Sequence, residues 1–176
     1  MTGPARRLVI GVGNPDAGDD AAGRLVARRL ARRNGCANEG PALVLRECDG
    51  EATALMAAWT GFDDVVIVDA CQAAGTPGRL HVLDGRTVER LAALQPRGHG
   101  SKRGSTHGLG VADALALACA LGTLPTRLVI YAIEGRHFEA GGELSPDVDH
   151  AIDEVVALLV QRSSHGANHA SPAGET

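Results

Sequence analysis

Short aliphatic runs alternate along the chain with segments in which apolar residues recur at helical spacing. Five runs rich in Val, Leu and Ile, each bounded by Gly, Pro or Asp, predict β-strands. They are Leu8–Gly13, Ala42–Cys48, Val65–Ala70, Arg79–Asp84 and Arg127–Ile133. The segments between them predict four helices. The first starts at Asp19–Asp20 and stops at Gly35, the second runs from Glu51 to Trp59, the third runs from Leu109 to Leu121, and the fourth begins at Ser145-Pro146. The Leu109–Leu121 segment is apolar on nearly all sides, so we expect it to be substantially buried, with Gly122 as its C-cap.

Strands that alternate with helices predict an α/β domain with a mainly parallel sheet. Only eight residues separate the third and fourth strands, whereas a parallel crossover needs about a dozen, so we expect the fourth strand to be antiparallel. The predicted fold class is therefore a three-layer αβα domain with a mixed five-stranded sheet. We expect residues 1–160 to form this single domain, the Gly-rich Gln95–Thr106 segment to be a basic loop, and the polar residues 161–176 to be an unfolded tail.

Composition narrows the function classes. The chain of 176 residues carries a formal charge of −4 and has only four Phe, Trp and Tyr residues, so it lacks the charge and the stacking surface that nucleic-acid binding needs. No apolar run approaches the roughly 20 residues of a membrane span, which makes a cytoplasmic protein without membrane contact the expectation. The four cysteines show no CxxC or CxxH spacing, so we expect free thiols and no structural zinc.

Acidic residues follow every predicted parallel strand, at the sheet edge where α/β folds bind their ligands. Two carboxylates and one imidazole among them, from Asp20, Asp69 and His107, form a set that suits a borderline divalent cation such as Zn or Ni. The alternative is that each acid caps a helix or shapes a turn and that His107 bonds backbone. The other polar residues of this edge are Asn14, Asp16, Asp19, Asp49 and Glu134.

A dinucleotide site is the first rival hypothesis. Gly11-Val12-Gly13 begins a GxGxxG pattern, but Asp16 replaces the third glycine. Asp19 and Asp20 then lie at the helix start where a pyrophosphate would bind, and their charges would repel it.

Five segments in order carry a resemblance to a known family: GVGNPDAGDDAAG (Gly11–Gly23), CDGEAT (Cys48–Thr53), VVIVDA (Val65–Ala70), STHGLGVADALALA (Ser105–Ala118) and IEG…LSPDV (Ile133–Val148). Together they resemble the hydrogenase maturation protease family over about residues 8–160. The resemblance implies a phosphorylase/hydrolase-like fold with one antiparallel strand. It also implies an endopeptidase that removes the C-terminal peptide from the large subunit precursor of a nickel-iron hydrogenase after nickel insertion, and that is a monomer when alone.

The resemblance also assigns roles to residues. Asp20, Asp69 and His107 match the catalytic, metal-contacting positions, which implies that they recognise nickel carried by the substrate, with no cofactor permanently bound and with Zn or Cd able to substitute in a crystal. Asp49 is implied in positioning the substrate, and Asn14 and Glu134 are further candidate substrate-binding residues. Asp20 stands where some members have Glu, so which of Asp19 and Asp20 faces the cleft stays open.

For the chemistry, Asp69 or a metal-bound water is the candidate to activate the attacking water, and amides of the first loop or the cation are candidates to stabilise the oxyanion. Cys48 and Cys71 are not expected to be nucleophiles, and His81 is expected to be a strand or surface residue. The remaining rival functions are a small-molecule hydrolase with its own metal, a nucleotide-binding or oxidoreductase domain, and a non-catalytic hydrogenase assembly factor.

Overall fold

A five-stranded sheet with the order β2-β1-β3-β5-β4 forms the centre of the protein. The computed structural model describes residues 7–34, 43–72, 75–85, 87 and 108–165. The strands are β1 (Arg7–Val12), β2 (Leu43–Cys48), β3 (Asp64–Gln72), β4 (Leu80–Asp84) and β5 (Arg127–Gly135). The helices are the 3-10 turn η1 (Gly18–Ala21) and the α-helices α1 (Ala22–Asn34), α2 (Ala52–Trp59), α4 (Gly108–Leu121) and α5 (Pro146–His165).

Strand direction follows the connection lengths. β1 pairs in parallel with β2 and β3, and β3 pairs in parallel with β5. β4 pairs antiparallel with β5, Leu80 lying opposite Ile133 and Asp84 opposite Val129. The prediction from the eight-residue connection is therefore confirmed, as is the mixed five-stranded α/β fold.

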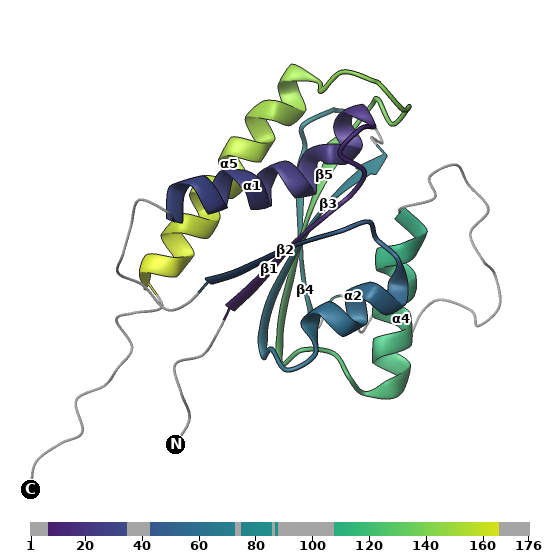
Figure 1. Ribbon diagram of the computed structural model, residues 1–176, viewed down its shortest axis with the longest axis vertical. Coiled ribbons are helices and arrows are strands. Elements are labelled where there is room, and N and C mark those ends of the chain that lie inside the picture. Colours follow the sequence, from purple (N-terminus) through teal and green to yellow (C-terminus); the bar gives the residue numbers. More distant parts are fainter. Residues whose placement is uncertain (1–6, 35–42, 73–74, 86, 88–107, 166–176) are drawn as a thin grey trace, which may run out of the picture.

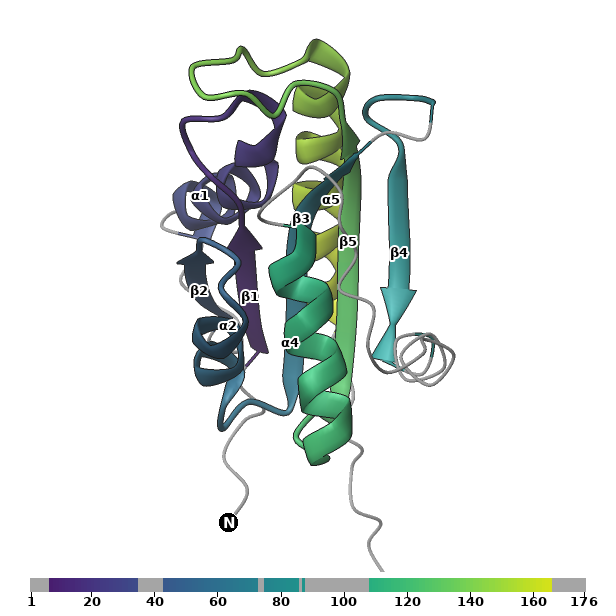
Figure 2. The same ribbon diagram turned by 90° about the vertical axis from the view of Figure 1, so that its right-hand side faces the viewer.

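Helices cover both faces of the sheet, α1 and α5 on one face and α2 and α4 on the other (Figures 1 and 2). Two hydrophobic clusters fill the interfaces: one groups Leu8, Ile10 and Ile67 with α2 and α4, and the other groups Val9 and Val66 with α1 and α5. β1 and β3 are buried along nearly their whole lengths on both faces. This explains why their sequences are continuous aliphatic runs without alternation.

Two expectations about helices are wrong in part. Val111, Ala114 and Ala118 of α4 face the core, but Leu117 and Leu121 are 42% and 60% exposed, so the helix is not buried all round. Helix α5 continues through His165, past the predicted domain end at residue 160. Residues 166–176 and the 95–106 loop lie outside the described residues.

The predicted C-cap of α4 and the predicted start of α5 are confirmed, whereas Asp19 and Asp20 form a 3-10 turn before α1 and Gly35 lies outside the described residues. Gly122 has a φ of +66°, and Thr123 N–H donates to the Ala118 carbonyl at 2.9 Å, which closes α4. Pro146 is the first residue of α5. No helix in the described part of the chain has the length and apolar character to cross a bilayer.

Candidate functional site

The loop after β1 is built on close backbone packing. Gly13 has a φ of +132°, and a Cβ at this position would lie 1.8 Å from the Asp20 carbonyl oxygen. A Cβ on Gly23 would lie 2.2 Å from the Val68 carbonyl oxygen. Only glycine permits these approaches, so the two glycines allow η1 and the start of α1 to lie directly on the carboxyl ends of β1 and β3.

Asp19 ties this loop to the segment between β5 and α5. Its side chain is fully buried. Its Oδ2 accepts hydrogen bonds from Arg136 N–H at 2.7 Å, His137 N–H at 3.0 Å and Ser145 Oγ at 2.8 Å, and its Oδ1 accepts one from Ser145 N–H at 2.7 Å. Burial acts to raise the pKa of Asp19, but these bonds outweigh it and hold the pKa below its ordinary value. Asp19 therefore has a structural role.

Asp20 lies in η1, which follows β1, and Asp69 lies in β3, three residues before the end of that strand. Asp20 is 2% exposed and Asp69 is 7% exposed, and η1, which carries Asp20, packs against β3, which carries Asp69. Asp20 Oδ2 accepts a hydrogen bond from Asn14 N–H at 2.8 Å, and Asp69 Oδ1 accepts one from Ala70 N–H at 2.9 Å. No Arg, Lys or His of the described segments forms an ion pair with Asp20. Of the two adjacent aspartates, Asp20 thus has fewer hydrogen-bond partners than Asp19 among the described residues.

The first turn of α4 reaches the same edge of the sheet. A Cβ on Gly110 would lie 1.6 Å from the Gly50 carbonyl oxygen, so the helix start packs directly on the loop after β2. Asp49 in that loop is exposed, and its Oδ1 accepts a hydrogen bond from Glu51 N–H at 3.2 Å. His107, the predicted third member of the metal-contacting set, lies outside the described residues. Within those residues no group of three or more His, Cys, Asp and Glu side chains is arranged to hold a metal.

The other two candidate substrate-binding residues have local partners. Asn14 is half-buried, and its Oδ1 accepts a hydrogen bond from Asp16 N–H at 3.0 Å, a turn-forming contact. Glu134 is buried, with Oε1 at 2.6 Å from His81 Nε2 and Oε2 accepting a bond from Thr76 N–H at 3.3 Å. The His81 bond, together with Thr76 N–H and the charges of His81 and Arg79, lowers the pKa of Glu134. The sequence analysis missed this partner of His81.

The main-chain amides of residues 13–17 in the first loop are already engaged, that of Asp16 by Asn14 Oδ1. Gly13 N–H donates to Cys48 O, Asn14 N–H to Asp20 Oδ2, Ala17 N–H to Asn14 O and Asp19 N–H to His137 O. Pro15 has no N–H. The hypothesis that amides of this loop stabilise an oxyanion is therefore not supported.

The same geometry argues against a dinucleotide site. The second glycine of a GxGxxG loop must leave its backbone open to the pyrophosphate. Here the space at Gly13 is filled by the Asp20 main chain.

Neither thiol near the edge is activated. Burial raises the pKa of Cys71 to about 11, with the charges of Glu134 and Asp69 acting in the same direction. Burial and the charge of Asp49 raise the pKa of Cys48. Because the thiolate is the nucleophile, these thiols are poorly suited to covalent catalysis.

Sequence comparisons with known proteins point to hydrogenase maturation. A model of the hydrogenase maturation protease family (HycI) matches residues 48–162. The chain is 29% identical over 161 residues to the hydrogenase expression/formation protein HupD of Rhodobacter capsulatus, covering 90% of this chain and 71% of that protein.

Solved structures give the same fold. The hydrogenase maturating endopeptidase HybD from E. coli aligns with a TM-score of 0.71 at 23% identity, covering 91% of this chain and 93% of that chain. The [NiFe] hydrogenase maturation protease HybD from Thermococcus kodakarensis aligns with a TM-score of 0.67 at 23% identity, covering 90% and 99%.

Proposed function

The chain belongs to the hydrogenase maturation protease family, and from this premise we propose that it removes the C-terminal peptide from the large subunit precursor of a nickel-iron hydrogenase after nickel has been inserted. The enzyme class, a hydrogenase maturation endopeptidase, follows from family membership. The nickel-iron class of the hydrogenase, the peptide removed and the order of events are our proposal. We further propose that the protein acts as a monomer in the cytoplasm, which sedimentation and cell fractionation would test.

The observation that carries this proposal is the placement of Asp20 and Asp69. Two carboxylates are buried, Asp69 in β3 and Asp20 in the turn η1 that packs against β3. Asp20 has a single amide donor and no ion pair within the part of the chain that the structure describes. A buried carboxylate that has few hydrogen-bond donors is stabilised by a nearby opposite charge. A cation delivered by the substrate supplies that charge only when the substrate is present.

His107 is proposed as the third contact. It lies three residues before Gly110, whose backbone packs on the loop after β2. Two carboxylates and an imidazole lack the thiolates that bind soft metals tightly, so they suit the recognition of a nickel ion already held by the substrate better than a resident metal.

Holding that nickel would place the scissile bond beside Asp69. Positioning of this kind is a large part of the rate gain in enzymes. We propose that Asp69 accepts the proton of the attacking water. Since the amides of the first loop are engaged, the substrate's own cation is the proposed partner for the developing oxyanion.

The experiment is the intact mass of the large subunit in cells that lack this protein and any related protease. We expect the precursor mass in these cells, and the mature mass after complementation with the wild-type chain. Asp69→Asn and His107→Ala should fail to complement. The matched control is Asp64→Asn, a buried aspartate at the opposite edge of the sheet, which should restore the mature mass. A mature subunit in the cells without this protein would contradict the proposal.

Two rivals are separated by further measurements. A stoichiometric metal that survives dialysis of protein purified without chelator would favour a hydrolase with its own metal. Full processing by Asp69→Asn would favour a non-catalytic assembly factor.

A further inference from the structure

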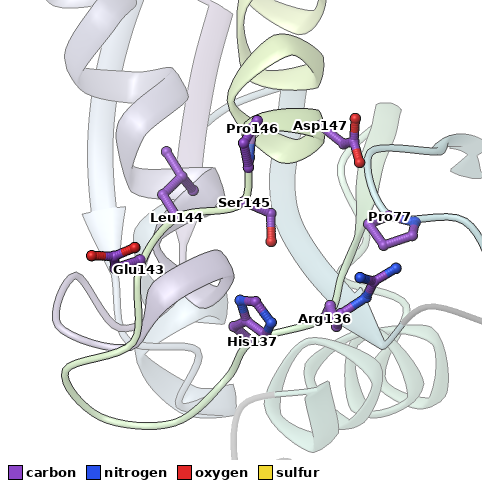
Figure 3. Close-up of a pocket in the computed structure, with 8 residues that line it drawn as sticks. All are labelled: Pro77, Arg136, His137, Glu143, Leu144, Ser145, Pro146 and Asp147. Carbon is purple, nitrogen blue, oxygen red and sulfur yellow. The ribbon is translucent and has the colours of Figure 1, made fainter.

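Two adjacent pockets lie beyond the end of β5, and both are lined by Pro77 and Arg136. The smaller, of about 180 Å³, lies between Arg136 and the start of α5 (Figure 3). The larger, of about 270 Å³, lies on the β3 side and is lined by Gln72, Gly75, Pro77, Gly135, Arg136 and Phe138. Each is smaller than the roughly 300–1,000 Å³ of typical small-molecule sites, so each has room for a side chain or a chain end rather than for a free metabolite.

Arg136 gives the larger pocket its charge. Among the described residues that line this pocket, it is the only ionisable one. Arg7, Arg28 and Arg29 each pair with a carboxylate, whereas Arg136 has no ion pair with any residue in the described ranges. Its main chain is held by the bond from its N–H to Asp19 Oδ2, so the guanidinium extends from a fixed point. A planar guanidinium fits a carboxylate with two parallel hydrogen bonds.

Two acidic residues near Arg136 disfavour a doubly charged anion. Glu143 and Asp147 line the smaller pocket together with Arg136 (Figure 3). Their charges oppose a phosphate dianion more strongly than a carboxylate.

The pocket lies on a defined side of the proposed site. In the sheet, β3 with Asp69 lies between β1, which leads to Asp20, and β5, which leads to Arg136. If the nickel-bearing part of the substrate lies on the Asp20 side, the part beyond the scissile bond continues towards Arg136. Gln72 follows Asp69 by three residues on β3, which is about 10 Å at roughly 3.3 Å per residue. An extended peptide would cover this with about three residues.

We propose that this Arg136 pocket binds a carboxylate of the substrate's C-terminal peptide, about three residues beyond the bond that is cleaved. The carboxylate comes from an acidic side chain or from the chain terminus, and the inference rests on the function proposed above. Arg136 is thus a specificity-determining residue that holds the departing peptide.

The test measures binding separately from cleavage. A fluorescent synthetic peptide with the sequence of the precursor's C-terminal segment is titrated with the full chain and followed by anisotropy. We expect Arg136→Gln to bind about 10- to 100-fold more weakly than wild type, because a hydrogen-bonded charge is lost. Arg136→Lys should lie between them, and the control Arg33→Gln, an exposed arginine at the end of α1, should bind like wild type.

Two peptide variants identify the carboxylate. In one the terminal carboxylate is an amide, and in the other the acidic side chains are amides. The peptide variant that lacks the carboxylate bound by Arg136 should bind the wild-type chain as weakly as the parent peptide binds Arg136→Gln. Its affinity should not fall further when the chain carries Arg136→Gln. Equal affinity of wild type and Arg136→Gln for the parent peptide, or full affinity of wild type for both amidated peptides, would overturn the inference.

Cleavage of the nickel-loaded precursor gives the second readout. Arg136→Gln should raise KM by a similar factor with kcat unchanged, which a merely structural role would not do. A wild-type chain that binds the peptide but never cleaves the precursor would contradict the proposed function and leave the pocket assignment in place.

Discussion

Replacement of Asp19 by Ala tests how the site is held together. This carboxylate accepts four hydrogen bonds from Arg136, His137 and Ser145, which lie 117 or more residues further along the chain. The change therefore removes the link between the loop after β1 and the segment between β5 and α5, without touching Asp20 or Asp69 directly.

The expected loss can be built up from the donors that are left behind. Ser145 N–H is buried, and an unpaired buried donor costs about 1–3 kcal/mol. The Arg136 and His137 amides are part-buried, so water can reach them and each bond lost costs about 0.5–1.5 kcal/mol. Without Ser145 Oγ, the total is about 2–6 kcal/mol, which corresponds to a fall in Tm of roughly 4–24 °C for a chain of this length.

The pH dependence has a defined sign. The folded-state pKa of Asp19 lies below its ordinary value of 3.8, so its stabilisation is fully present above about pH 4 and is lost as the pH falls through the lower, folded pKa. Wild type should therefore lose stability in acid more steeply than Asp19→Asn.

Urea unfolding of wild type, Asp19→Ala and Asp19→Asn between pH 7 and pH 2.5 is the assay. Asp16→Ala, an exposed aspartate of the same loop, is the matched control and should stay within about 0.5 kcal/mol of wild type. The reasoning is refuted if Asp19→Ala unfolds within about 1 kcal/mol of wild type at pH 7, because the smallest loss expected is about 2 kcal/mol. It is also refuted if the gap between wild type and Asp19→Asn is the same at every pH.

Three further predictions concern other positions. Gly13→Ala should destabilise the fold by about 3 kcal/mol or more, because its Cβ would overlap the Asp20 carbonyl; Gly61→Ala, also at positive φ but with open space around it, should cost only about 1–2 kcal/mol in the same thermal melts. Cys71, with its pKa raised to about 11 by burial and nearby carboxylates, should react with iodoacetamide far more slowly at pH 7 than a free cysteine, and mass spectrometry showing equal rates would contradict this. Asp64→Asn removes the partner of two arginines at the edge remote from the site and should cost about 1–3 kcal/mol in urea unfolding while leaving cleavage at the wild-type rate; a loss of cleavage by folded protein would contradict it.

The fold was accessible from sequence because local patterns specify it. The aliphatic runs of β1 and β3 are strands buried on both faces. The short connection after β3 permits only a next strand that runs antiparallel to it, and this strand, β4, pairs with β5. Gly122 and Pro146 mark helix ends by backbone chemistry alone. The exposure of Leu117 and Leu121 could not be predicted from the sequence, since burial depends on which other elements pack against a helix.

For the candidate site, the sequence predicted only a set of acidic residues at one edge of the sheet. Asp19 and Asp20 are chemically identical neighbours. Their roles differ because Asp19 accepts hydrogen bonds from the segment after β5, while Asp20 accepts one from Asn14 N–H. The pairing of Glu134 with His81 spans 53 residues and carries no local signal. That Asp20, Asp69 and His107 bind one metal together stays a prediction.

Cleavage of purified precursor in two forms tests the central claim most directly. The nickel-loaded and the nickel-free large subunit are each incubated with the wild-type chain, and the intact mass is followed with time. The account predicts that the nickel-loaded precursor alone is shortened, and that Asp69→Asn leaves it at full length. Equal cleavage of the nickel-free precursor, or a nickel-loaded precursor that the wild-type chain leaves intact, would contradict it.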